Sequence, residues 1–167
     1  KDPAARPTPS LIKETVGILS LMALWLLPIL LLTSYAPTAL LIAVPFIHLS
    51  NYFFCKKLLF PSGMSQREHE LFSTGYYSWW FLQRMWTLNT FWLNHIQGTW
   101  FYNIYLRLCG ARVDWQARID TTLIDVPDLL EVGDGTYIGD EAVLSSVTYS
   151  DRTIKLFPIR IGSNCSI

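Results

Sequence analysis

Apolar residues gather near the start of the chain in a pattern that predicts two adjacent helices. No Asp, Glu, Lys or Arg occurs in residues 15–55, which is enough chain for two membrane crossings of about 20 residues each. Residues 16–32 are almost continuously apolar, and a turn at Pro37 separates them from residues 38–54, because the residue before a proline avoids the helical region. We expect a transmembrane helical hairpin at residues 15–55, after a proline-rich linker at residues 1–14.

Cations flank this predicted hairpin and are absent from its turn. Lys13 precedes it, and Lys56 and Lys57 follow it. Because Lys and Arg favour the cytoplasmic side, we expect an integral membrane segment with both ends of the hairpin in the cytoplasm. The alternatives are a signal peptide at the first helix and a helical pair buried in a soluble core. His48 is expected to be solvated or bonded to the backbone rather than to relay protons.

Residues 56–110 are rich in aromatic side chains and predict helices at the membrane interface. Trp79, Leu82 and Trp86 recur at helical spacing, and amphipathic aromatic rings favour the headgroup layer. The segment also carries too many polar residues for a third crossing. The alternative is a packed aromatic core that seats the domain that follows.

From Val113 onward the pattern changes to a period of six. Each repeat starts with an aliphatic residue followed by Asp or Gly, and a repeating pattern of this kind is typical of a triangular solenoid. The five starts are Val113, Ile119, Val132, Ile138 and Ile161. We therefore predict a left-handed parallel β-helix at residues 111–167. Its last repeat is cut short after Ile167, so we expect an incomplete β-helix, with residues 149–158 forming an excursion from it.

The charge balance and the spacing of the cysteines argue against a nucleic-acid partner, a metal site and a disulfide framework. The chain has 13 Lys and Arg and 13 Asp and Glu, for a net charge of zero. A basic patch for nucleic acid is therefore not expected. The three cysteines are far apart, which predicts neither a metal site nor a disulfide framework.

Five short segments carry a family resemblance: residues 98–99, 105–113, 119–121, 127–129 and 132–139. Together they resemble the membrane-bound C-terminal region of the ε-poly-lysine synthetase-like family of nonribosomal peptide synthetases. In that family, adenylation and carrier domains precede membrane helices that alternate with β-helix domains of the acetyltransferase type. The resemblance implies a membrane-embedded, acyltransferase-like module that joins amino acids through amide bonds.

The resemblance also implies partners and a substrate. The partners would be membrane lipid together with carrier and adenylation domains of the same polypeptide or of another one. The acyl donor would be an aminoacyl thioester on the phosphopantetheine arm of a carrier domain elsewhere, so the segment itself is expected to bind no cofactor. Upstream sequence with an adenylation domain and a carrier serine would favour this function.

The family pattern also implies a histidine at the position of Val147, just before the pair matching Asp151 and Arg152. No histidine follows His95 in this chain. The candidate bases that remain are Asp151, Tyr149 and His95. Two other functions stay open: a membrane-linked O- or N-acetyltransferase acting on a sugar or lipid, and a non-catalytic scaffold that holds neighbouring domains at the membrane.

Overall fold

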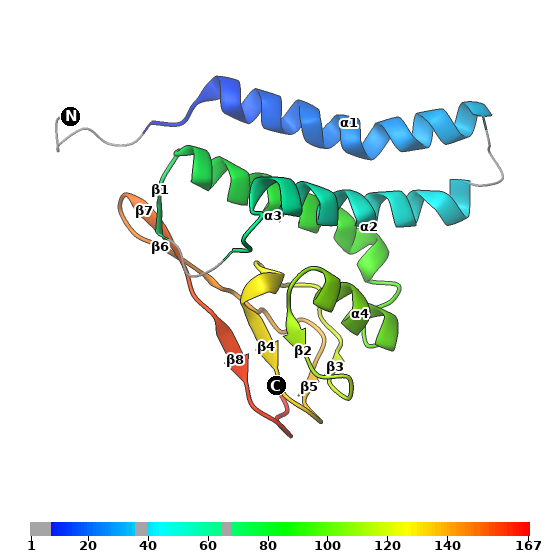
Figure 1. Cartoon of the computed structure of the whole chain (residues 1–167), viewed down its shortest axis with the longest axis vertical. Coiled ribbons are helices and arrows are strands. Elements are labelled where there is room, and N and C mark those ends of the chain that lie inside the picture. Colours follow the sequence, from blue (N-terminus) through cyan, green and yellow to red (C-terminus); the bar gives the residue numbers. More distant parts are fainter. Residues whose placement is uncertain (1–7, 36–39, 65–67) are drawn as a thin grey trace.

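The computed structural model describes residues 8–35, 40–64 and 68–167. Over these residues the chain forms a layer of helices with a smaller region of short strands beneath it (Figure 1). The helices are α1 (Leu11–Tyr35), α2 (Leu40–Leu59), α3 (Thr74–Leu93) and α4 (Trp100–Leu108), with one 3-10 turn, η2 (Pro127–Leu129). The strands are β1 (Glu68–Glu70), β2 (Arg112–Val113), β3 (Arg118–Ile119), β4 (Leu130–Val132), β5 (Tyr137–Ile138), β6 (Val147–Tyr149), β7 (Thr153–Leu156) and β8 (Ile159–Ile161).

The charge-free stretch contains two helices, as its apolar pattern predicted. Helix α1 begins at Leu11, inside the expected linker, and α2 continues to Leu59. Among the described residues, α1 is the one helix that is long and apolar enough to cross a membrane by length and composition. The expected topology, with both ends of a hairpin in the cytoplasm, stays a prediction.

A proline inside α1 explains how polar side chains of α2 are used. Pro28 has no N–H, so the carbonyl of Leu24, four residues earlier, has no partner within the helix. Asn51 Nδ2 of α2 donates to that carbonyl at 3.3 Å. One residue on, the carbonyl of Trp25 lies 2.9 Å from Nε2 of His48. His48 is thus bonded to the backbone of the neighbouring helix, which agrees with the expectation from the sequence.

His48 also joins α2 to α3. Trp92 Nε1 donates to His48 Nδ1 at 2.9 Å, and Asn89 Nδ2 donates to the His48 carbonyl at 3.2 Å. Because Nδ1 accepts a hydrogen bond, the proton of the neutral ring is on Nε2, which donates to Trp25. The three long helices are therefore fixed to one another by directional hydrogen bonds as well as by apolar packing.

The aromatic face of α3 is part of the interior. Trp79, Leu82 and Trp86, the residues that predicted an interfacial helix, are at most 4% exposed. The Trp86 ring packs against Tyr52 of α2 and stacks on Tyr105 of α4, with ring centroids 5.2 and 6.0 Å apart. The packed-core alternative therefore describes this face, because these side chains are buried against the neighbouring helices and the strand region.

The predicted left-handed β-helix is wrong. The described residues form small separate sheets, some parallel and one antiparallel, and they contain no closed or solenoid β-helix. Strands β2, β4 and β8 pair in parallel, as do β3 and β5, and each has only two or three residues. Beside them, β1, β7 and β6 form an antiparallel sheet.

The antiparallel sheet supplies the physical reason for this correction. The period of six breaks where residues 147–156 fold into the β6–β7 hairpin, and β7 pairs on its other side with β1. This pairing brings together segments 85 residues apart, which no local repeat can reveal. The aliphatic residues Val132, Ile138 and Leu144 are nevertheless buried, so the repeat identified core positions while it predicted the wrong architecture.

Side chains of helix α4 hold the strand region against the helical layer through hydrogen bonds. Tyr102 Oη donates to the carbonyl of Thr121 at 2.8 Å, and Asn103 Nδ2 donates to that of Ala117 at 2.6 Å. From α3, Trp86 Nε1 donates to the carbonyl of Thr122 at 3.0 Å. Backbone carbonyls of the strand region that would otherwise lose their hydrogen bonds on burial are thus satisfied by side chains of the helices.

Candidate functional site

A polar pocket of about 350 Å³ lies between α3 and the strand region. One wall comes from α3 and carries aromatic, amide and guanidinium groups. The other wall comes from β6 and the segments before β4 and β6, and it carries a carboxylate, a hydroxyl, an aliphatic side chain and a phenol. The lining residues are Tyr76, Trp79, Trp80, Gln83, Arg84, Asp125, Ser145, Val147 and Tyr149.

A backbone bridge brings the carboxylate and the hydroxyl of the pocket together. Ile124 and Leu144, both buried, form an isolated parallel bridge. The next residue on each side is polar, so Asp125 and Ser145 lie next to each other. Ser145 Oγ donates to Asp125 Oδ2 at 2.6 Å, and this hydrogen bond holds the carboxylate in place at the pocket wall.

The aromatic wall is built by helical spacing on α3. The Tyr76 and Trp79 ring centroids lie 5.9 Å apart, and Trp79 meets the ring of Tyr149 edge to face at 6.3 Å. Trp79 Nε1 is buried and has no hydrogen-bond partner among the described residues. Arg84 is exposed and forms no ion pair with another residue that the structure describes.

The two phenols of the pocket stay protonated near neutral pH. Tyr149 is 63% exposed, but partial desolvation in the pocket raises its pKa, the neighbouring Tyr76 and Asp125 raise it further, and the cation of Arg84 opposes them. The pKa of Tyr76 is also raised, again mainly by burial. A phenol with a raised pKa is a hydrogen-bond donor and a poor base. Tyr149 is therefore suited to stabilise a carbonyl oxygen and unsuited to remove a proton.

The structure separates the residues that the sequence nominated. Val147 and Tyr149 both line the polar pocket. Asp151 lies in the exposed turn between β6 and β7 and is absent from the pocket lining. His95 follows the end of α3, where its Nδ1 lies 2.9 Å from the carbonyl of Phe91.

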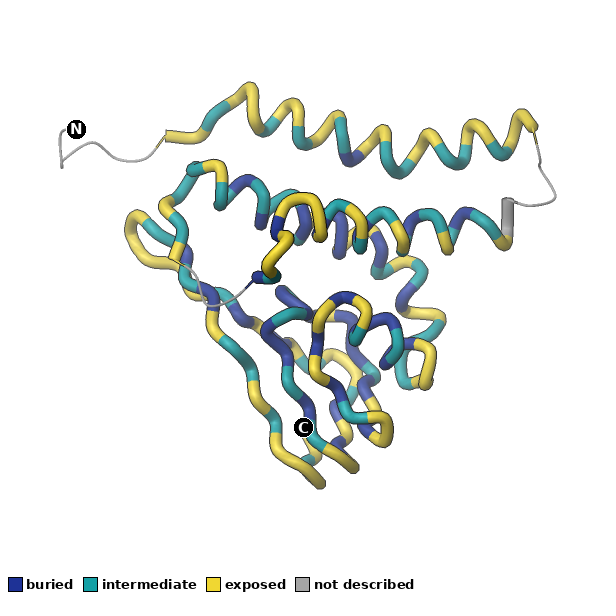
Figure 2. The backbone as a smooth tube through the Cα atoms, viewed as in Figure 1, coloured by how far each residue is buried: buried dark blue, intermediate teal, exposed yellow. Residues whose placement is uncertain are grey.

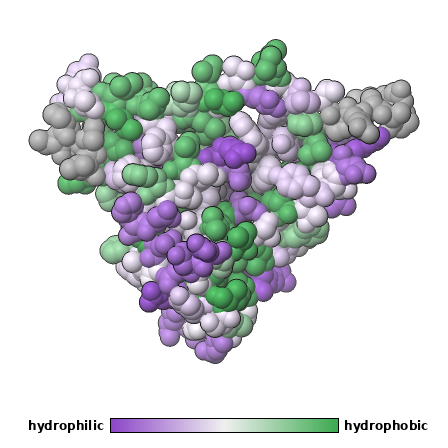
Figure 3. Space-filling view, turned by 180° about the vertical axis from the view of Figure 1, so that it is seen from behind, coloured by the Kyte–Doolittle hydropathy of each residue, from purple (hydrophilic) through white to green (hydrophobic). Residues whose placement is uncertain are grey.

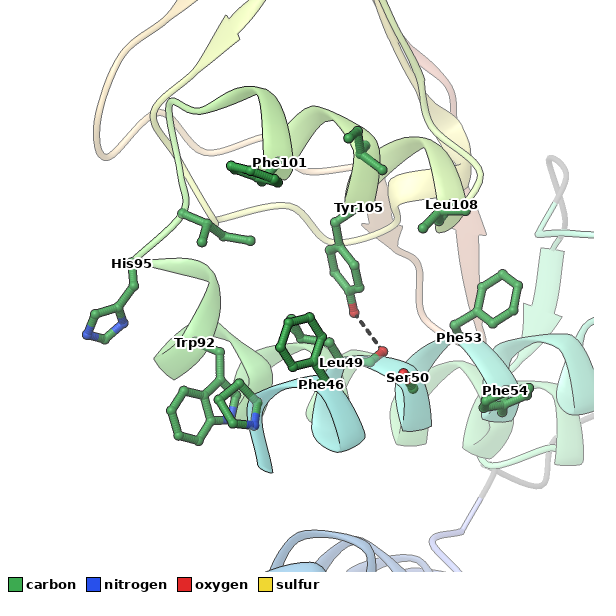
Figure 4. A pocket seen from close by; sticks show the side chains of 13 residues that line it. Phe46, Leu49, Ser50, Phe53, Phe54, Trp92, His95, Phe101, Tyr105 and Leu108 are labelled. Atoms are coloured by element: carbon green, nitrogen blue, oxygen red, sulfur yellow. Dashed lines mark hydrogen bonds between the residues drawn. The ribbon is translucent and has the colours of Figure 1, made fainter. Parts of the chain in front are cut away.

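His95 borders a different cavity, which is apolar and has a volume of about 680 Å³ (Figure 4). This cavity lies between α2, the end of α3 and α4, and aromatic and aliphatic side chains such as Phe46, Phe53 and Phe101 dominate its lining. The hydroxyl of Tyr105 donates to the carbonyl of Leu49 at 3.2 Å, so that polar group is already used. Among the described residues that line this cavity there is no carboxylate, so none orients the His95 ring there.

The polar-pocket residues that the sequence did not nominate include Asp125, Ser145 and Arg84. The first two follow buried aliphatic residues that pair across the strand region, and that pairing is the signal that could have found them. Arg84 comes from a helix distant in sequence, and no local pattern links it to β6. Among the described residues, no group of three His, Cys, Asp or Glu gathers that could hold a metal ion.

Comparisons with known proteins identify one distant relative of interest. The chain is 28% identical over 90 residues to a protein named delta-poly-L-ornithine synthetase from Acinetobacter baumannii (strain AB307-0294). The match covers 54% of this chain and 7% of that protein. No family model matches the chain, and no solved structure matches it significantly. The relationship is therefore a distant one to a protein many times longer than this chain.

Proposed function

We propose that this chain is a segment of an amide-bond-forming synthetase and that the polar pocket between α3 and β6 binds its substrates. The similarity to a protein named as a poly-ornithine synthetase carries this proposal. The position where the synthetase-like family is expected to have a histidine lines this pocket, which directs the proposal to the pocket, while the Val147 found there counts against the family's usual base. In this proposal, an adenylation domain activates an amino acid and a carrier domain presents it as a thioester.

The reaction requires proton removal and charge stabilisation. The amine nitrogen attacks the thioester carbonyl, the C–N bond forms, the C–S bond breaks, and the sulfur leaves as a thiolate that finally takes up the proton lost by the amine. Asp125 is the carboxylate of the pocket, and in this proposal it accepts the proton that the amine loses. The neutral phenol of Tyr149 donates a hydrogen bond to the carbonyl oxygen as that oxygen becomes negative. Neither role requires His95 or Asp151.

The test uses the complete polypeptide in which this chain occurs, supplied with ATP and amino acids, with amide product quantified by mass spectrometry. Asp125→Asn removes the base and should lower the rate by about 10² to 10⁴, the usual contribution of general acid–base assistance. Tyr149→Phe removes the oxyanion donor and should also lower the rate. The matched control is Asp151→Asn, a carboxylate outside the pocket, which should leave the rate unchanged.

Two results would contradict this assignment of the site. If Asp125→Asn forms product at the original rate, the pocket does not supply the base. If Asp151→Asn loses as much activity as Asp125→Asn, the turn between β6 and β7 is the functional segment. In each case circular dichroism of the variant must match the original protein, so that unfolding is not read as loss of chemistry.

A non-catalytic role for this segment is the second candidate. The observation that favours it is the pocket lining, which has no histidine and has phenols that stay protonated. In that role the segment holds active neighbouring domains in place. Asp125→Asn and Tyr149→Phe would then leave the rate unchanged, while loss of the segment would still abolish product formation.

A further inference from the structure

The outer face of α1 is a continuous apolar surface. Leu19, Leu26 and Leu30 are 60%, 45% and 62% exposed, and Met22 and Leu27 between them are also exposed. In Figure 2 the helix is exposed along its whole length on the side away from the rest of the molecule. From Val16 to Tyr35 the helix carries no charged residue.

This surface fits a lipid bilayer better than a protein partner. Interfaces with soluble proteins have a polar rim around an apolar centre, whereas α1 is apolar on its outer and inner sides alike. Its inner side already has a protein partner: a Cβ on Gly17 would come within 2.9 Å of the Trp80 ring. In Figure 3 hydrophobic side chains gather along the upper edge of the molecule, where the helices lie, and the lower part carries hydrophilic side chains together with a hydrophobic patch.

Hydrogen bonds fix the direction of α1 relative to α3. At the start of both helices, Ser10 N donates to Tyr77 Oη at 2.7 Å. Near the end of α3, His48 joins the carbonyl of Trp25 to the indole of Trp92. Helices α1 and α3 therefore run in the same direction side by side, and whatever angle α1 makes with a membrane, α3 makes nearly the same one.

The strand region packs along α3 from near its start, where Trp79 meets Tyr149, to its C-terminal cap, where Thr122 Oγ1 donates to Asn94 Oδ1 at 2.8 Å. Trp86, near the midpoint of α3, bonds to the carbonyl of Thr122. Arg84, two residues earlier, lines the polar pocket together with Asp125 of the strand region. If α1 and α3 crossed a bilayer, these charged groups would lie near its centre, where ionised side chains are strongly disfavoured.

We infer that α1 lies in the plane of the membrane, with its outer face among the lipid acyl chains and the strand region in the water on one side. This orientation replaces the bilayer-crossing hairpin expected from the sequence. At 25 residues, α1 is roughly 37 Å long, and lying flat it presents that whole length to one leaflet. The inference does not depend on the proposed amide chemistry.

The test measures depth along α1 in vesicles made of equal parts phosphatidylcholine and phosphatidylglycerol. The three native cysteines are replaced by serine, and single cysteines at Leu19, Leu26 and Leu30 carry a fluorophore. Lipids with a nitroxide near the headgroup or deep in the acyl chain quench it according to depth. An in-plane helix gives three equal, shallow depths, and Asp151→Cys in the strand region, the matched control, shows no quenching.

A second readout is sidedness, measured with a membrane-impermeant thiol reagent on Lys13→Cys and Ser34→Cys. An in-plane helix exposes both ends on the same side, so both sites react together. Depths that are greatest at the middle of α1, with the two ends labelled from opposite sides, would overturn the inference in favour of a crossing helix. Absence of quenching at all three positions would overturn it as well, because the face would then not contact lipid.

Discussion

The buried ion pair between Lys56 and Asp128 offers a stringent test of the fold. Lys56 Nζ donates to Asp128 Oδ1 and to the carbonyl of Cys109, and Asp128 Oδ2 accepts from Met64 N at 2.8 Å. The two charged side chains are 10% and 8% exposed. Lys56→Met would leave the carboxylate buried without its cation, so we expect a loss of about 3 to 5 kcal/mol in the free energy of unfolding.

The matched control is the adjacent Lys57→Met, which removes the same charge from an exposed position. It should cost roughly 0 to 1 kcal/mol. The double variant Lys56→Met/Asp128→Asn removes the uncompensated charge and keeps an oxygen that can accept from Met64 N. It should therefore recover much of the stability that Lys56→Met loses.

The assay is urea denaturation in mild detergent, followed by tryptophan fluorescence, because the chain has seven tryptophans. The expected order of midpoints is Lys57→Met highest, the double variant next, and Lys56→Met lowest. Equal midpoints for Lys56→Met and Lys57→Met would refute the burial of this pair. A double variant less stable than Lys56→Met would refute the reasoning that an unpaired buried carboxylate causes the loss.

Three further outcomes follow from contacts described above. Asn51→Leu leaves the Leu24 carbonyl without its donor, so the free energy of unfolding should fall by about 1 to 3 kcal/mol in the same urea assay; an unchanged midpoint would contradict that contact. Burial raises the pKa of Cys109 from 9.0 to about 12. Between these pH values the thiol of the unfolded chain loses its proton while the folded one keeps it, so the free energy of unfolding should decrease as pH rises. Cys109→Ala should make this decrease smaller. Val147→His places an imidazole in the polar pocket and should increase amide formation by the complete polypeptide, by up to about 10²; a folded variant with unchanged rate would place the reacting atoms elsewhere.

The helices could be predicted from the sequence because their signal is local. A long stretch without charge favours a helix where it is removed from water, since a helix satisfies its own backbone. The sequence alone does not show which side of each helix packs against the rest of the protein. The face of Trp79, Leu82 and Trp86 satisfies the pattern of an interfacial helix and of a buried one equally well, and the position of α2 and α4 decides between them.

The strand region shows where a repeat stops being informative. Burial of Val132 and Ile138 follows from aliphatic periodicity, because residues at inward positions must be apolar. Strand partners do not follow from periodicity: β7 pairs with β1, and that partner lies before α3 in the chain. A period of six thus located the core and led to the wrong architecture.

The candidate site was predicted in part. Tyr149 and Val147 came from the family pattern, and both line the polar pocket. Asp151 is close to them in sequence and lies outside the pocket, because the β6–β7 turn directs it to solvent. Arg84 could not be nominated, since only the packing of α3 against the strand region brings it to this site.

The carbonyl that Pro28 leaves open makes two distant positions depend on each other. Asn51 is useful in an apolar helix only because that carbonyl needs a donor, and Pro28 is tolerable only because a donor is present. Substitutions at the two sites should therefore arise together during evolution. Where a residue other than proline replaces Pro28, the Leu24 carbonyl regains its bond within the helix, and an aliphatic side chain in place of Asn51 should stabilise the protein. Such paired changes in related sequences would record the contact between α1 and α2 without any structure.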